Sequence, residues 1–415
     1  MKLRRLILLL LILVVSGCGN VEAVENAQQY ITTIEELNIP DDVKVIGLGE
    51  ATHGNVEFQQ LKKDVMEVLA KNEGVQVFVL EGDFGAGQKI NQFILSGKGT
   101  AKEAVFALDY EIYRTQEMID LVQWMHDYNN KATNDEKVYF YGNDMQRYDA
   151  SKQGLLDFYQ PLSEEKMSQY EQKLSAVSND TMRELTKEQL EQVMVTLDEI
   201  ISDLQHNEES YSEQSTAEGY ALALQYARVM KQRTNLFLTD NYTQLRDQYL
   251  AENLKWIVDY ESSRGHSKIL ISGHNGHIEK TSANAAGYKS MGNYLDETYG
   301  DEYFAIGTDF LESEFQAKNG SSDKREIYKV SNKNQLLEVF RNVEGSIFYV
   351  NFEKATESEE LSSIIATKHK MANIGDDFRS WYKFVKSFYT IEMTPEEAYD
   401  GIIIVKNATP TKVID

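Results

Sequence analysis

The chain has 415 residues, 42% hydrophobic and 26% charged, so it can bury a large core, and its composition excludes intrinsic disorder. Its net charge of −24 opposes binding to polyanions, so we expect no nucleic acid partner. Cys18 is the only cysteine, which excludes a disulfide, a zinc thiolate site and a cysteine nucleophile from the rest of the chain.

The first residues have the pattern of an export signal. Basic residues precede a ten-residue apolar run from Leu6 to Val15, which is too short to span a bilayer as a mature helix. The motif Val-Ser-Gly-Cys that ends at Cys18 resembles a bacterial lipobox, which implies cleavage before Cys18 and lipidation of that cysteine. We expect residues 1–17 to be a lipoprotein signal peptide and 18–31 a tether. The protein would then be exported and lipid-anchored to the outer face of the cell membrane.

Apolar strands and amphipathic helices alternate after the tether. Strands that are apolar throughout indicate a parallel sheet that is buried on both faces. We therefore predict an α/β fold, with a mostly parallel sheet covered by helices on both faces. The predicted strands are Val43–Gly49, Gly74–Leu80, Lys137–Gly142, Lys268–Ser272, Tyr303–Gly307, Gly345–Val350 and Gly401–Val405, and the predicted helices are Val56–Ala70, Thr115–Tyr128 and Asn241–Ser262.

Residues 161–238 have long charged stretches with apolar residues at helical spacing and almost no strand signal. We predict a helical insertion there, dividing an α/β catalytic domain of residues 32–160 and 239–415. The insertion is either a lid over the cleft or simply a helical cover on the sheet, and the sequence leaves both interpretations open. The stretch Asp376–Arg379 and the aromatic residues that follow, 381–389, are expected to pack under a loop.

Acidic and histidine residues follow several predicted strands, where ligands bind in sheets of this class. Glu50 and His53 are three residues apart in a glycine-rich turn, which suits a carboxylate that holds one imidazole nitrogen while the other acts as a base. Glu81 ends a very apolar strand, where a carboxylate is costly unless it is solvated, paired or neutralised. We expect an active site at this edge, formed by Glu50, His53, Glu81, Asp144, His274 and His277.

Six motifs occur in a fixed order along the chain: Gly47–Gly54, Val79–Glu81, Thr115 with Glu117, Tyr141–Gln146, Arg246-Asp247 with Ala251–Asn253, and Gly273–His277. Together they resemble the erythromycin esterase family, from about Val43 to Phe310. The resemblance implies a cofactor-free hydrolase that cleaves a small-molecule ester or a macrolide lactone, a reaction associated with antibiotic resistance.

The resemblance also implies roles for individual residues. His53 is expected to activate water for attack on the ester carbonyl, and Glu50 to orient His53. Glu81, His274 and His277 would complete the catalytic site, and Lys62, Asp144 and Arg246 would contact the substrate. Lys62 and Lys63 stand where a family arginine is expected, and a lysine lacks the bidentate fork of a guanidinium. The substrate contacts can therefore differ from those of the family.

Two alternatives remain open from the sequence. The same glutamate and histidine cluster offers ligands for zinc or manganese, so the protein could be a metal-dependent hydrolase. It could also be a surface binding lipoprotein without turnover. Metal content separates the first alternative from metal-free hydrolysis, and ligand binding by a His53→Ala variant separates the second.

Overall fold

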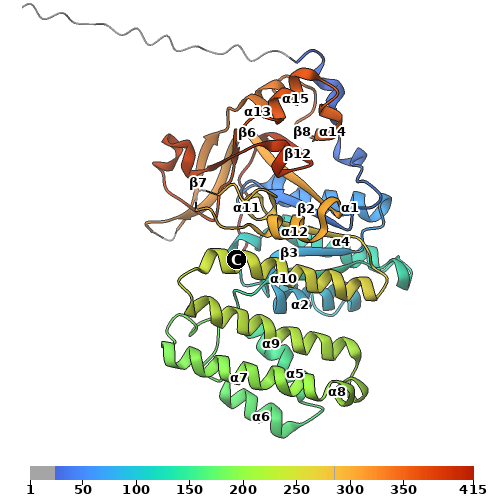
Figure 1. The fold of residues 1–415 in the computed structure, drawn as a ribbon, viewed down its shortest axis with the longest axis vertical. Coiled ribbons are helices and arrows are strands. Elements are labelled where there is room, and N and C mark those ends of the chain that lie inside the picture. The colour runs from blue at the N-terminus through green and yellow to red at the C-terminus, as the bar shows by residue number, and fades with distance from the viewer. Residues whose placement is uncertain (1–23, 285, 323) are drawn as a thin grey trace, which may run out of the picture.

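The computed structural model describes residues 24–284, 286–322 and 324–415 (Figure 1). The expected signal peptide and Cys18 lie outside these residues. None of the helices formed by the described residues has the length and hydropathy needed to cross a bilayer.

A ten-stranded sheet forms the centre of the molecule, in the order β1-β8-β12-β6-β2-β5-β3-β4, with β7 and β10 paired to β6. Strands β12, β6, β2, β5, β3 and β4 run parallel, whereas β8 is antiparallel to its neighbours. The predicted α/β fold with a mostly parallel sheet is confirmed. The strands are β1 Ile31–Thr32, β2 Val45–Glu50, β3 Val77–Asp83, β4 Tyr139–Asp144, β5 Ile269–His274, β6 Tyr303–Asn319, β7 Arg325–Ser331, β8 Ile347–Asn351, β10 Asp377–Phe378 and β12 Gly401–Ala408, and β9 His369–Ala372 and β11 Thr390–Met393 form a separate pair.

Successive side chains of a strand point to opposite faces of the sheet. The apolar strands therefore present apolar side chains on both faces, and helices cover each face. In β3, Phe78 and Leu80 belong to one buried cluster, while Val77 and Val79 belong to the other. The first cluster is completed mainly by α1 Val56–Asn72, α2 Phe84–Ser96, α3 Ala101–Phe106 and α4 Gln116–Asn129. The second is completed by helices that include α10 Tyr242–Ser263 and α12 Met291–Tyr299.

A further group of helices lies beyond α10, at one end of the molecule (Figure 1). Helix α9 packs against α5, α7 and α10, so this group extends the second face rather than the sheet edge. Threonine caps begin the two long helices, with a reciprocal Thr186–Gln189 capping box at α7 and Thr216 at α9. The helices are α5 Asp149–Tyr159, α6 Glu164–Lys173, α7 Lys187–His206, α8 Glu208–Gln214 and α9 Ala217–Leu238.

Strand β6 is much longer than the predicted Tyr303–Gly307. Its residues are buried without interruption through Leu311, where it lies between β2 and β12. Beyond that point the strand pairs with β7, and its burial becomes irregular. The second half therefore lacks the continuous apolar run from which the first half was predicted.

The aromatic residues after Asp376 do not all pack under a loop as expected. Phe378 is buried, with its ring 5.1 Å from that of Phe315. Trp381, Phe384 and Phe388, however, are 49%, 78% and 46% exposed. The expectation is wrong for these three residues, which lie in or next to two short 3₁₀ turns at the protein surface.

Candidate active site

The turn after β2 places Glu50 and His53 at the carboxyl edge of the sheet. Glu50 ends β2 and pairs in register with His274, which ends β5. Gly54 is required for this turn, because a Cβ atom there would lie 1.9 Å from the backbone oxygen of Gln316 in β6. The close approach to β6 fixes the turn that carries His53.

Glu50 is a buried carboxylate between an imidazole and an ammonium group. Its Oε2 lies 2.9 Å from Nδ1 of His53, and its Oε1 lies 2.9 Å from Nζ of Lys62. Gln59 donates to the same Oε1 at 2.8 Å and to the backbone oxygen of His53. Burial alone would raise the pKa of Glu50, but Lys62 and His53 outweigh it and hold that pKa at about 2. Glu50 is therefore ionised and orients the His53 ring.

His53 has its Nδ1 occupied by Glu50 and lines the neighbouring cavity. Burial lowers its pKa, but the Glu50 carboxylate outweighs burial, so the His53 pKa lies above its ordinary value. Within the described residues, Nε2 of His53 makes no hydrogen bond. The geometry therefore leaves this nitrogen available to a molecule in the cavity.

His274 is the uncharged histidine of the site. Its ring lies 5.1 Å from that of His53, and its Nε2 lies 3.0 Å from the carbonyl oxygen of Ile374. Burial, reinforced by the charge on His53, lowers the pKa of His274 to about 3. Because a carbonyl only accepts, Nε2 carries the proton and Nδ1 is the acceptor.

Arg246 joins two buried carboxylates at the neighbouring strand ends. Its Nη2 lies 2.8 Å from Oε1 of Glu81 and 2.6 Å from Oδ2 of Asp144. The backbone amide of His274 donates to the second oxygen of Glu81 at 2.8 Å. Burial would raise the pKa of Glu81, but His277 and Arg246 outweigh it and lower that pKa well below its usual range. Arg246 therefore compensates the carboxylates of Glu81 and Asp144 at the two strand ends.

His277 is the cationic histidine. Its Nδ1 lies 2.6 Å from Oδ1 of Asp247, and its Nε2 lies 3.4 Å from Oε1 of Glu81 and 3.2 Å from Nη1 of Arg246. Burial lowers its pKa, but Asp247 and Glu81 outweigh burial and raise the pKa to about 9. A protonated ring has no acceptor for Arg246; it donates to Asp247 and forms an ion pair with Glu81.

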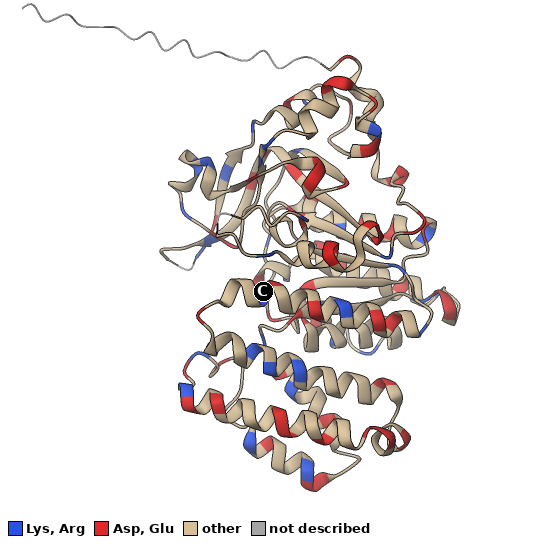
Figure 2. Cartoon of the chain, viewed as in Figure 1, with Lys and Arg blue, Asp and Glu red and all other residues tan. Residues whose placement is uncertain are grey.

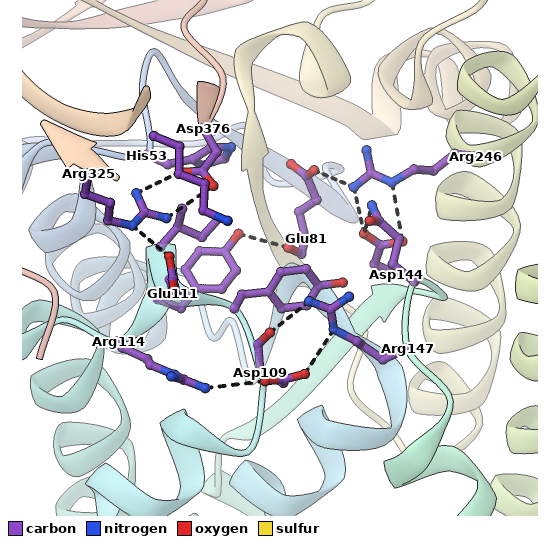
Figure 3. Close-up of a pocket in the computed structure, with 15 residues that line it drawn as sticks. His53, Glu81, Asp109, Glu111, Arg114, Asp144, Arg147, Arg246, Arg325 and Asp376 are labelled. Carbon is purple, nitrogen blue, oxygen red and sulfur yellow. Dashed lines mark hydrogen bonds and ion pairs between the residues drawn. The ribbon is translucent and has the colours of Figure 1, made fainter. Parts of the chain in front are cut away.

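A cavity of about 500 Å³ opens in front of His53 (Figure 3). Glu81, Asp144 and Arg246 lie on one side of it. Its lining is mostly polar or charged, and it includes Asp109, Tyr110, Glu111, Ile112, Tyr113, Arg114, Gln146, Arg147, Lys318, Arg325 and Asp376. No described residue of the 161–238 region lines this cavity.

Ion pairs also fix other parts of the cavity wall. Arg325 of β7 lies 3.1 Å from Glu111 and 2.8 Å from Asp376, and so joins three separate parts of the chain (Figure 3). Arg114 and Arg147 both lie 3.4 Å from oxygens of Asp109. The wall is therefore ordered by charge rather than by apolar packing.

The structure brings the predicted acid and histidine residues together but places Lys62 elsewhere. Lys62 is 1% exposed and lies behind Glu50, so it does not reach the cavity where substrate contact was expected. Asp144 and Arg246 do line the cavity. His274 and His277 lie behind the lining residues, in contact with the site through Glu81.

Several site residues were missed by the sequence analysis. Asp247 was included only in a family motif, although it holds His277. Gln59 and Tyr113 were not identified; Tyr113 donates to the backbone oxygen of Glu81 at 2.9 Å and its ring stands edge-on to His53. Asp247 could have been found as the neighbour of Arg246. No local pattern indicated Tyr113, because it lies outside the predicted elements.

Within the part of the chain that the structure describes, no three histidine, cysteine or acidic side chains are arranged to hold a metal ion. The carboxylates already have cationic partners, Lys62 for Glu50 and Arg246 for Glu81. A divalent cation would have to displace these side chains to bind.

Comparisons of this chain with known proteins agree on one family. The erythromycin esterase family model matches residues 70–408, a range that begins after the Gly47–Gly54 motif and continues well beyond the last motif, Gly273–His277. Erythromycin esterase type II of Escherichia coli is 25% identical over 404 residues, covering 90% of this chain and 91% of that protein.

Two crystal structures share the fold. A Bacillus cereus protein has a TM-score of 0.78 and 22% identity, covering 94% of this chain and 97% of its own. A succinoglycan biosynthesis protein has a TM-score of 0.77 and 21% identity, covering 95% and 98%.

The Lys62–Glu50 pair gives a stability prediction. A Lys62→Met variant leaves the Glu50 charge buried without its ammonium partner, so we expect a loss of about 3–5 kcal/mol in the free energy of unfolding. The double variant Lys62→Met/Glu50→Gln removes both charges and should recover part of this loss. Urea unfolding of Lys62→Met, Glu50→Gln and the double variant measures the coupling free energy between the two side chains. If the double variant lost the sum of the two single losses, the two side chains would not be coupled and the prediction would be wrong.

Proposed function

We propose that this chain, which belongs to the erythromycin esterase family, is a carboxylic ester hydrolase in which His53 activates water. Family membership supports the hydrolase class. The observation that carries the mechanism is the geometry of His53, whose Nδ1 is held by Glu50 while Nε2 remains available to the cavity. This is the arrangement that a general base requires.

In the proposed reaction, a water molecule attacks the ester carbonyl while Nε2 of His53 takes its proton. The carbonyl oxygen gains negative charge, and Arg246, fixed by Glu81 and Asp144, supplies positive charge at the cavity wall. The carbon–oxygen bond to the alcohol then breaks, and protonated His53 returns the proton to the leaving oxygen. The products are a carboxylic acid and an alcohol, and the base is regenerated.

His277 and Lys62 act indirectly in this scheme. Protonated His277 forms an ion pair with Glu81 and so adds positive charge next to Arg246. Lys62 keeps Glu50 ionised, and the ionised Glu50 holds the His53 ring. Because only neutral His53 accepts a proton, hydrolysis should increase as the pH rises through the raised His53 pKa.

The cavity supports an ester of a polar, hydroxylated or charged compound. Most of its lining residues are ionised or hydrogen-bonding, whereas a typical small-molecule site is lined mainly by apolar side chains. One relative is named an erythromycin esterase and one structural neighbour a succinoglycan biosynthesis protein. A macrolide lactone and an acylated sugar are therefore the two substrate classes to compare.

Replacing His53 tests the proposal. We expect His53→Ala to lower kcat for ester hydrolysis about 10²–10⁴-fold, because the base is lost while Arg246 remains. His206→Ala, in an exposed histidine at the end of α7, is the matched control and should keep full activity. The measurement is mass spectrometry of erythromycin and of an acylated sugar for the addition of one water, with and without a chelator.

The outcomes separate the alternatives. Turnover that survives the chelator and is lost in His53→Ala supports metal-free hydrolysis. Turnover abolished by the chelator contradicts it and favours a metal-dependent hydrolase. A compound that binds without turnover, equally well to the wild type and to His53→Ala, indicates a binding protein instead.

We also propose that the protein is exported and anchored by a lipid on Cys18, on the basis of the apolar run and the lipobox-like motif. Cys18→Ser should abolish incorporation of labelled palmitate in growing cells and release the protein from the membrane fraction. Ser16→Ala keeps the small residue of the motif and serves as the control. A wild-type protein that incorporates no label would contradict the anchor.

A further inference from the structure

A short surface segment, residues 381–388, takes no part in the proposed reaction and exposes an unusual amount of apolar surface. Trp381, Phe384, Val385 and Phe388 are 49%, 78%, 41% and 46% exposed. They make up half of the large hydrophobic residues exposed in the described chain, concentrated in eight positions. A contiguous exposed apolar patch of this kind marks an interaction surface.

The rings of this aromatic segment form a fixed platform rather than a loose loop. Tyr382 and Phe388 are stacked with centroids 4.6 Å apart, and Trp381 stands edge-on to Phe388 at 4.7 Å. Two 3₁₀ turns, Tyr382–Phe384 and Lys386–Phe388, hold the backbone. The protein therefore keeps these side chains exposed in a defined arrangement.

The aromatic segment is basic although the protein is strongly acidic. Between residues 379 and 391 the sequence has three basic residues and no acidic one, against a net charge of −24 for the chain. Lys386 donates to the backbone oxygen of Lys333 at 3.1 Å, which brings a further lysine alongside. Figure 2 shows this basic colouring on the segment beside β7. The patch thus combines aromatic rings with positive charge.

We propose that the aromatic segment binds the headgroup region of an anionic lipid bilayer. Aromatic rings with a polar edge partition into the membrane interface. Lysine stems lie along apolar surface while their ammonium groups reach anionic headgroups. The charge of the patch matches such a surface, whereas the rest of the protein would be repelled by it.

The position of the aromatic segment agrees with this orientation. It lies beside β7, away from the α6–α9 end of the molecule, and the described chain begins in that same half (Figure 1). Cys18, the proposed anchor, precedes Val24 by six residues, which reach at most roughly 20 Å. Strand β10, just before the segment, pairs with Lys318, which lines the cavity. Membrane contact would therefore bring the cavity mouth close to the bilayer.

Tryptophan fluorescence tests the contact directly, because the chain has only three tryptophans. In the full chain, W124F/W256F leaves Trp381 as the reporter, and W256F/W381F leaves Trp124 as the matched control on α4. Each is mixed with vesicles of phosphatidylcholine and brominated phosphatidylglycerol. We expect Trp381 to be quenched and Trp124 to be unaffected.

Charge and self-association distinguish the possible occupants. With Trp381 as the reporter, K383Q/K386Q should weaken the apparent vesicle affinity on the order of 10-fold, and high salt, or vesicles made only of brominated phosphatidylcholine, should weaken it similarly. Equal quenching of the two reporters, or none, would overturn the proposal. So would a concentration-dependent change in Trp381 fluorescence without vesicles, which would identify a second copy of the chain as the occupant.

Discussion

A buried carboxylate that must remain ionised is the constraint around which this site is arranged. Glu50 is 1% exposed at the end of a central strand, where an unpaired charge would be strongly unfavourable. Lys62 from α1 and His53 from the turn after β2 compensate this charge from opposite sides. Glu50, through its contacts with Lys62 and His53, links the folding of α1 against the sheet to the orientation of the His53 ring. The orientation of the proposed base and the stability of the domain therefore depend on the same buried carboxylate.

At the neighbouring strand ends, a guanidinium group compensates the charge of buried carboxylates in the same way. Arg246 connects Glu81 and Asp144, and Asp247, the next residue, holds His277. Three histidines within one cluster thus have different protonation states. His274 is neutral, His277 is cationic, and His53 has a raised pKa. Environments that separate the pKa values of neighbouring groups are what divides acid, base and electrostatic roles in an active site.

Local sequence patterns were sufficient to predict the parallel strands and several of the side chains that meet at their carboxyl ends. Uniformly apolar runs identified the parallel strands, and the carboxyl ends of such strands converge, so Glu81 and His274 were expected to meet. Contacts between distant segments were not predictable. Lys62 gives no local sign that it points into the protein, and the Arg325 ion pairs depend on how β6 and β7 leave the sheet. The outward-facing rings after Asp376 likewise depend on what the fold leaves uncovered.

The central claim is that Glu50 sets the proton affinity of His53. Nuclear magnetic resonance titration of the histidine ring signals, assigned with His53→Ala, measures this in the wild type and in Glu50→Gln. We predict that His53 titrates above its ordinary pKa of about 6.5 in the wild type and below it in the variant, because burial persists while the carboxylate charge is lost. The ring signals of the exposed His206 serve as the internal control. An unchanged His53 pKa in Glu50→Gln would contradict the account.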